Sequence, residues 1–178
     1  MKKKILTILT GAMLTASVSF AAPITDVQQG QTNIGYNHYN LDISGQNVDA
    51  DAFYLEGAVS DKVILGIERN SYSGTIEDDT TDVYAQYKLD PNVRLILGSR
   101  DYNDMSSKVF YGIGATTNLA ANLDGYASVT KSSVATEWQT GLNYKVSEQA
   151  TLNLGYKSYK HDGLPTLDGV GFGLGYKF

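Results

Sequence analysis

Six charged residues recur on the face of predicted strands that lies opposite the aliphatic side chains, and they are the main candidates for a functional site. They are Glu56, Glu68, Arg94, Arg100, Lys145 and Lys157. Side chains alternate between the two faces of an extended strand, so these residues share a face that the Val, Leu and Ile side chains avoid. Both signs of charge occur. Because an unpaired buried charge is costly, we expect acids and bases to pair across an enclosed interior.

The residue types that usually carry out catalysis give little support to an enzyme. GxSxG, HExxH and a phosphate-binding glycine loop are all missing. The histidines are His38 and His161, and His161 with Asp162 on a predicted loop is similar to the His/Asp site at the rim of the omptin proteases. Neighbouring residues of a strand point to opposite faces, and the long loops of those enzymes are missing. We therefore interpret His161 as a solvated residue and predict no enzymatic activity.

A run of acidic residues, Glu77 to Asp79 with Asp82 nearby, offers the oxygen ligands that calcium and magnesium prefer. No spaced calcium-loop pattern accompanies this run, so we interpret it as a hydrated loop. The sequence has no cysteine, which excludes disulfides and thiolate metal ligands. We expect neither a metal nor a cofactor.

The elements that must position the charged residues are best defined at the carboxyl end. Residues 169–178 read GVGFGLGYKF and alternate apolar side chains mostly with glycine. An apolar outer face opposite a nearly bare inner face is typical of a barrel strand in lipid. The aromatic end resembles the terminal strand that bacterial outer-membrane barrels present to their assembly machinery. The assembly signal that this resemblance implies comprises Phe172, Leu174, Tyr176 and Phe178.

The middle of the chain repeats one pattern four times, namely two strands of roughly ten residues joined by a short turn. The turns fall at residues 60–62, 90–92, 118–122 and 147–149. A first strand at 31–43, with a bulge predicted near Asn37, precedes a polar loop at 44–50. With the last strand the count is ten, and merging the weak strand 123–131 with a neighbour gives eight. The pattern predicts an all-β, transmembrane, antiparallel up-and-down barrel.

The amino terminus has the three parts of a secretory signal peptide, which are Lys2 to Lys4, an apolar stretch and small residues before a cleavage site after Ala21. Residues 1–21 are thus the predicted signal, and residues 22–178 a single barrel domain that opens with a short polar lead. Without the signal, 14 basic residues fall to 11 against 19 acidic ones, a net charge of −8. This balance argues against nucleic acid as a partner.

The signal peptide, the repeated hairpins and the aromatic terminus make the whole chain resemble the small outer-membrane β-barrels of the OmpA, OmpX and opacity type. Ten strands depart from the eight usual in that group. The resemblance implies an outer-membrane location, contact with lipids and lipopolysaccharide, insertion by the barrel-assembly machinery and a monomer. Interfacial aromatic girdles suit amphipathic rings. Their predicted members are Tyr72, Tyr87, Tyr102, Tyr144 and Tyr159.

The charge pattern favours a mostly occluded polar lumen and a structural or membrane-integrity role. Opposite charges on different walls pair more readily than they form the single-sign ring of an ion-selective pore. Two alternatives stay open at this point. One is a narrow passive channel for small solutes, and the other is an adhesin-like surface protein that acts through extracellular loops.

Overall fold

Ten antiparallel strands close into a barrel in the computed structural model, which describes residues 22–74, 79–103 and 106–178. The predicted signal at 1–21 and two members of the acidic run, Glu77 and Asp78, lie outside the described residues. The strands are β1 (Thr32–Ile43), β2 (Gln46–Ala58), β3 (Val63–Gly74), β4 (Asp79–Lys88), β5 (Val93–Tyr102), β6 (Lys108–Ala120), β7 (Leu123–Ser132), β8 (Ala135–Lys145), β9 (Ala150–His161) and β10 (Thr166–Lys177).

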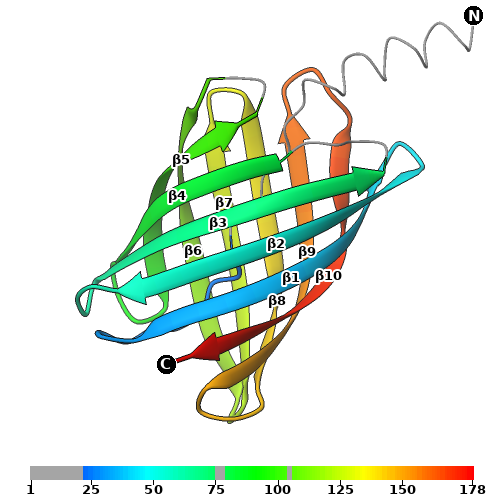
Figure 1. The fold of residues 1–178 in the computed structure, drawn as a ribbon. Helices are drawn as coiled ribbons and strands as arrows, with labels where there is room; N and C mark the ends of the chain where they lie inside the picture. The colour runs from blue at the N-terminus through cyan, green and yellow to red at the C-terminus, as the bar shows by residue number, and fades with distance from the viewer. Residues whose placement is uncertain (1–21, 75–78, 104–105) are drawn as a thin grey trace, which may run out of the picture.

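Each strand pairs with its neighbours in the sequence, and β1 pairs with β10 to close the ring (Figure 1). The weakly patterned β7 is paired with both β6 and β8 along its length. The prediction of an all-β, up-and-down barrel is therefore confirmed with ten strands, and the eight-strand alternative is wrong. No helix in the described part of the chain is long and apolar enough to cross a membrane.

The first strand differs from its prediction. The register of β1 with β2 and with β10 runs without interruption through Asn37, so the predicted bulge is wrong. The apolar residues change parity because the two halves of β1 use them differently. Ile34 is half exposed on the outer face, whereas Tyr39 and Leu41 are buried inside the barrel.

The predicted loop at 44–50 is also wrong, because β2 already begins at Gln46. Ser44 and Gly45 form a two-residue turn and both have positive φ, 56° and 83°. Two successive residues with positive φ are typical of the hairpin turns that match strand twist. The residues beyond the turn are not solvated, since Val48 and Ala50 are buried in the barrel.

The barrel has two distinct ends. At the terminal end, where β1 begins and β10 ends, short turns join the other strands in pairs. Three of these turns are closed by a side chain that accepts backbone N–H groups: Asp90 Oδ1 from Val93 at 2.9 Å, Ser60 Oγ from Val63 at 3.1 Å and Ser147 Oγ from Ala150 at 2.9 Å. We call the opposite end the loop end.

The outer surface of the barrel is apolar around its whole circumference. Such a surface far exceeds the scattered apolar residues of a soluble monomer and marks contact with lipid or another apolar phase. Every strand contributes exposed side chains, among them Ile34, Phe53, Leu65, Val83, Leu95, Tyr111, Val129, Trp138, Leu154 and Phe172.

Glycines on the inner face let aromatic rings lie flat against the wall. A Cβ atom at Gly66 would lie 2.3 Å from Cζ of Tyr84, and one at Gly171 would lie 2.1 Å from Cδ1 of Tyr39. Both distances are far below van der Waals contact. The space that glycine leaves is thus occupied by rings, which narrows the lumen.

Candidate functional site: the barrel interior

An ionic cluster crosses the middle of the lumen. The Arg100 guanidinium of β5 donates to both carboxylate oxygens of Asp82 on β4, at 2.9 and 2.8 Å. It also lies 3.4 Å from Oε2 of Glu137, which is on β8. All three residues are at most 2% exposed. Because β5 and β8 are not neighbours in the ring, the contact with Glu137 joins separate walls and fills the centre of the barrel.

Glu68 and Lys157 complete this cluster. Glu68 faces Asp82 in register and is fully buried. Neither of its carboxylate oxygens makes a hydrogen bond within 3.5 Å, and the Asn70 side chain lies beside it. Lys157, Asp82 and Glu137 are the charged groups that interact with it electrostatically. The Lys157 ammonium also lies 4.2 Å from the centroid of the Tyr39 ring, a cation–π contact.

A second polar cluster lies nearer the terminal end. Glu56 accepts hydrogen bonds from Tyr84 at 3.0 Å and from Gln86 at 2.7 Å. Arg94 Nη1 donates to Gln86 Oε1 at 3.0 Å, so Gln86 links the buried acid to the buried base. Such a network is stable only when its members are well satisfied.

Residues 22–27 enter the barrel, where Figure 1 draws them in blue within the ring of strands. Side chains from β4, β5, β8 and β10 donate to five of their backbone carbonyls. The bonds run from Gln139 to Ala22 (2.9 Å), Asn143 to Ile24 (3.0 Å), Arg94 to Thr25 (3.0 Å), Lys177 to Asp26 (2.5 Å) and Lys88 to Val27 (2.7 Å). We call this segment the plug.

Apolar contacts and further polar bonds fix the plug. Ile24 is 1% exposed and its Cδ1 atom occupies the space over Gly114, where a Cβ would lie 1.9 Å away. Val27 is fully buried with Ala58 and Ile64. The Thr25 hydroxyl donates to Glu56 Oε2 at 3.1 Å, which connects the plug to the second polar cluster.

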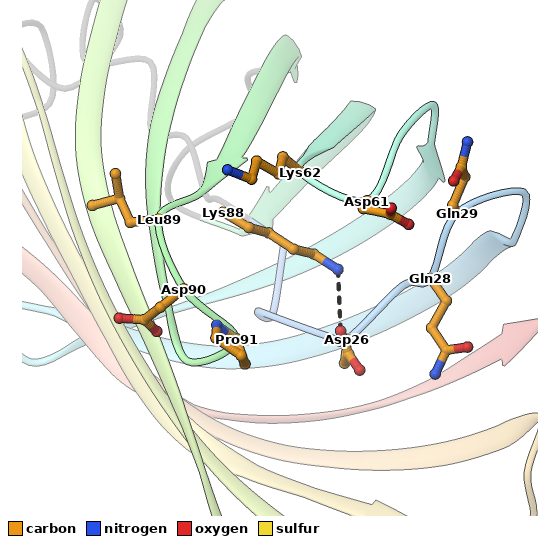
Figure 2. Close-up of a pocket in the computed structure, with 9 residues that line it drawn as sticks. All are labelled: Asp26, Gln28, Gln29, Asp61, Lys62, Lys88, Leu89, Asp90 and Pro91. Carbon is orange, nitrogen blue, oxygen red and sulfur yellow. Dashed lines mark hydrogen bonds and ion pairs between the residues drawn. The ribbon is translucent and has the colours of Figure 1, made fainter.

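The plug leaves an open polar pocket at the terminal end, of about 640 Å³. Figure 2 shows this pocket between the plug and the turns that follow β2 and β4. Lys88 reaches across it, with its ammonium 3.3 Å from Asp26 Oδ1. The pocket is lined by Asp26, Gln28, Gln29, Asp61, Lys62, Lys88, Leu89, Asp90 and Pro91.

At the loop end the inner wall is apolar rather than polar. One buried cluster joins the strands from β8 through β10 and β1 to β3. Tyr39 contacts the ionic cluster through Lys157, and Tyr159 lies two positions after Lys157 on β9. Its members are Tyr39, Leu41, Ile43, Val48, Ala50, Tyr72, Ala135, Tyr159 and Leu167.

The predicted charged residues fall in two groups. Glu56, Glu68, Arg94, Arg100 and Lys157 are at most 2% exposed and lie in the lumen. Lys145 does not join them, because its ammonium pairs with Asp124 at 2.7 Å near the end of β8, with its side chain 40% exposed. Lys145 is the last residue of β8, at the terminal end of the barrel, where its side chain is accessible to water.

Sequence reasoning missed several partners of these residues. Asp82 was grouped with the acidic loop, although it shares its parity with Tyr84 and Gln86, which also face the lumen. Glu137 could have been found in the same way from Gln139. The plug carried no such signal, because a segment without regular structure has no periodicity to read.

Of the five predicted girdle tyrosines, two lie on the outer surface of the barrel and three face the lumen. Tyr87 and Tyr144 are exposed on the outer surface, at 45% and 51%. Tyr72, Tyr102 and Tyr159 are at most 5% exposed inside the barrel, so their assignment to a girdle is wrong. The reason is strand parity, since they lie two residues after Asn70, Arg100 and Lys157 respectively, all of which face the lumen.

The residues of the predicted assembly signal all lie on the outer face of β10 or at its end. Phe172, Leu174, Tyr176 and Phe178 are between 45% and 65% exposed. The backbone of Phe178 is tied to β1, because its N–H donates to the Thr32 carbonyl at 2.9 Å.

The histidines and acids form no site with several ligands in the described ranges. His161 Nδ1 lies 3.0 Å from the backbone carbonyl of Asp162 rather than from its carboxylate. His38 is on the outer face and contacts Asp51 at 2.9 Å. Asp79 pairs with Arg69 at 2.7 Å. Among the residues described, no group of three or more His, Asp or Glu side chains could hold a metal ion.

Comparison with solved structures identifies the fold. The KdgM porin in complex with disordered oligogalacturonate is 12% identical, with 82% of this chain and 99% of that chain covered and a TM-score of 0.52. Another KdgM porin structure has the same identity and coverage and a TM-score of 0.50. The N-terminal barrel domain of Pseudomonas aeruginosa OprF is 15% identical, with 84% of this chain and 98% of that chain covered and a TM-score of 0.47.

No protein-family model matches the sequence, and the search of curated proteins found no significant match. At such low identity the structural likeness establishes the fold and no more. An apolar outer surface on a closed ring of strands is the architecture of a membrane barrel. The resemblance inferred from the sequence is confirmed: the chain has the fold of the small bacterial outer-membrane β-barrels.

Proposed function

We propose that this protein is an integral outer-membrane barrel with a closed lumen and a structural or membrane-integrity role. In this proposal a signal peptide directs export and is cleaved after Ala21, so that the terminal end faces the periplasm. The exposed apolar side chains of the outer surface contact lipid and lipopolysaccharide, and the barrel acts as a monomer.

The observation that carries the closed lumen is the plug. Five of its backbone carbonyls accept hydrogen bonds from side chains of four different strands, which fix the position of the plug against the wall. The contact of Arg100 with Glu137 crosses the lumen just beyond it. A ten-stranded barrel is only slightly wider than the eight-stranded barrels that side chains alone can fill. Plug and ion pairs together occupy much of the lumen that the strands enclose.

The test is conductance of the mature protein in planar lipid bilayers. We expect little or no steady current, because ions would have to pass both the plug and the buried ion pairs. A large, stable and ohmic conductance would instead support the narrow passive channel, the alternative toward which the porin-like fold points. A heat-modifiable band on gels, recovered from the outer-membrane fraction, controls for correct folding and location.

The adhesin alternative receives less support. Two of the connections at the loop end contain only two residues, 44–45 and 133–134, and residues 162–165 form a third of four residues. Such connections present little surface to a ligand. The other two connections at the loop end, 75–78 and 103–107, include residues outside the described ones.

Assembly provides a second test of the outer-membrane proposal. Replacing Phe178 by Asp is expected to lower the yield of folded barrel strongly, because a charged end on β10 weakens its recognition and its closure against β1. Pulse-chase labelling with the heat-modifiability assay measures the rate. The matched control is Asp162→Asn in a loop-end connection, which should assemble normally. Equal assembly of Phe178→Asp and the control would contradict the role of the terminal strand.

A further inference from the structure

We infer that the lumen contains a binding site for the chain's own α-ammonium group, created at Ala22 when the signal peptide is removed, and that Glu68 provides its negative charge. This inference rests on the proposed cleavage after Ala21. It assigns the amino terminus of the mature protein a position in the barrel interior, where it would lock the plug in place.

The direction of the plug leads to this site. β8 runs from the loop end to the terminal end, and along it Gln139 comes before Asn143. Gln139 binds the carbonyl of Ala22, whereas Asn143 binds that of Ile24. The plug therefore runs deeper into the barrel toward Ala22. The next lumen-facing residue of β8 beyond Gln139 is Glu137, so the amino group of Ala22 is on the side of the ionic cluster.

The charges of that cluster do not balance. The described residues facing this part of the lumen include three carboxylates, Glu68, Asp82 and Glu137, against two cations, Arg100 and Lys157. In the second cluster Glu56 faces Arg94, and Lys177 also lies within electrostatic range of Glu56. With all three carboxylates ionised, one negative charge is left over in this part of the lumen, and a buried charge without compensation is strongly unfavourable.

Glu68 identifies where the missing cation belongs. Arg100 is engaged with Asp82 and Glu137, while Glu68 has Lys157 as its nearby cation, and neither of its buried oxygens makes a hydrogen bond within 3.5 Å. An ammonium group offers three N–H donors in a compact volume, which suits such a carboxylate. An α-ammonium at Ala22 is already held in the lumen by Gln139, so its binding requires little additional ordering.

The experiment measures the chemical reactivity of the amino terminus. The protein is purified from outer membranes, its start at Ala22 is verified by intact mass, and the folded barrel in detergent is treated with an acetylating N-hydroxysuccinimide ester. Peptide mass spectrometry then compares the α-amine with the ε-amine of Lys62, which is exposed in a terminal-end turn. We expect Lys62 to react equally in folded and heat-unfolded protein, and the α-amine to react at least about tenfold more slowly in the folded state.

Two variants test the role of Glu68. Glu68→Gln keeps the size but removes the charge, and is expected to raise acetylation of the α-amine in the folded barrel on the order of tenfold. Glu68→Asp keeps the charge and should retain most of the protection. An α-amine that reacts as fast in folded as in unfolded protein, an intact mass with another start, or no difference between Glu68→Gln and Glu68→Asp would each overturn the inference.

Conductance of the same preparation separates this inference from the proposed function. A conducting barrel with a protected α-amine would contradict the closed lumen alone. A closed barrel with a reactive α-amine would contradict the binding site alone. The comparison of folded with unfolded protein needs no variant, so it stays decisive even where Glu68→Gln fails to fold.

Discussion

Deleting residues 23–29 is expected to convert the closed barrel into one that conducts ions and unfolds more easily. The deletion retains Ala22, so the predicted signal-peptidase site is unchanged. It removes the buried side chains of Ile24 and Val27, each worth about 1.5–3 kcal/mol, so the free energy of unfolding should fall by on the order of 3 kcal/mol. In the deletion variant, water takes the place of the plug and hydrogen-bonds the polar side chains of the wall. The terminal half of the lumen is then open to ions.

Both effects are measurable on one preparation. Guanidinium unfolding can be followed through the fluorescence of Trp138, the only tryptophan, and steady current through planar bilayers. The matched control replaces Gln28 and Gln29 by Ala, because both are exposed in the same segment and contact the pocket at the terminal end. An unchanged current and an unchanged midpoint for the deletion would mean that the segment does not occupy the lumen of the mature protein.

The strand pattern made the barrel predictable from the sequence, because alternation is a local property. Leu152 and Leu154 on β9 and Phe172 and Leu174 on β10 point to one face whatever the neighbouring strands are. The same rule would have placed Tyr72, Tyr102 and Tyr159 in the lumen. The girdle prediction for these three tyrosines was wrong because it used their position along the strand and ignored which face of the strand they occupy. The physical information was present in the sequence.

The plug is a different case, because no local pattern specifies it. Thr25 meets Glu56 across 31 positions of the sequence, and Gln139 meets Ala22 across 117. Such contacts depend on the closed ring, which brings β4, β5, β8 and β10 around one segment. The prediction for the apolar half of β1 was wrong for a related reason. Tyr39 and Leu41 pack inside the barrel against apolar side chains of other strands. The rule that lumen-facing residues are polar and lipid-facing residues are apolar therefore does not hold for this half of β1.

Removing the charge of Arg100 is expected to be the most destabilising single substitution in the lumen. In Arg100→Met the aliphatic stem is kept, while Asp82 and Glu137 lose the cation between them. Both carboxylates are at most 2% exposed, so water cannot readily replace the guanidinium. Breaking a buried pair in this way costs about 3–5 kcal/mol. Guanidinium unfolding followed through Trp138 measures the loss. Neutralising Arg94 as well should lower the unfolding temperature further, because it leaves Glu56 uncompensated.

The size of this effect distinguishes buried ion pairs from hydrated ones. Arg69→Met is the matched control, because Arg69 pairs with Asp79 at a similar distance, 2.7 Å, but its side chain is 64% exposed. An exposed pair contributes at most about 1 kcal/mol, so this control should unfold nearly as the wild type does. Adding Asp82→Asn to Arg100→Met removes one stranded carboxylate and should restore part of the lost stability. If Arg100→Met and Arg69→Met cost the same, the Arg100 side chain is in open water, and the lumen contains a hydrated path where this structure has an ion pair.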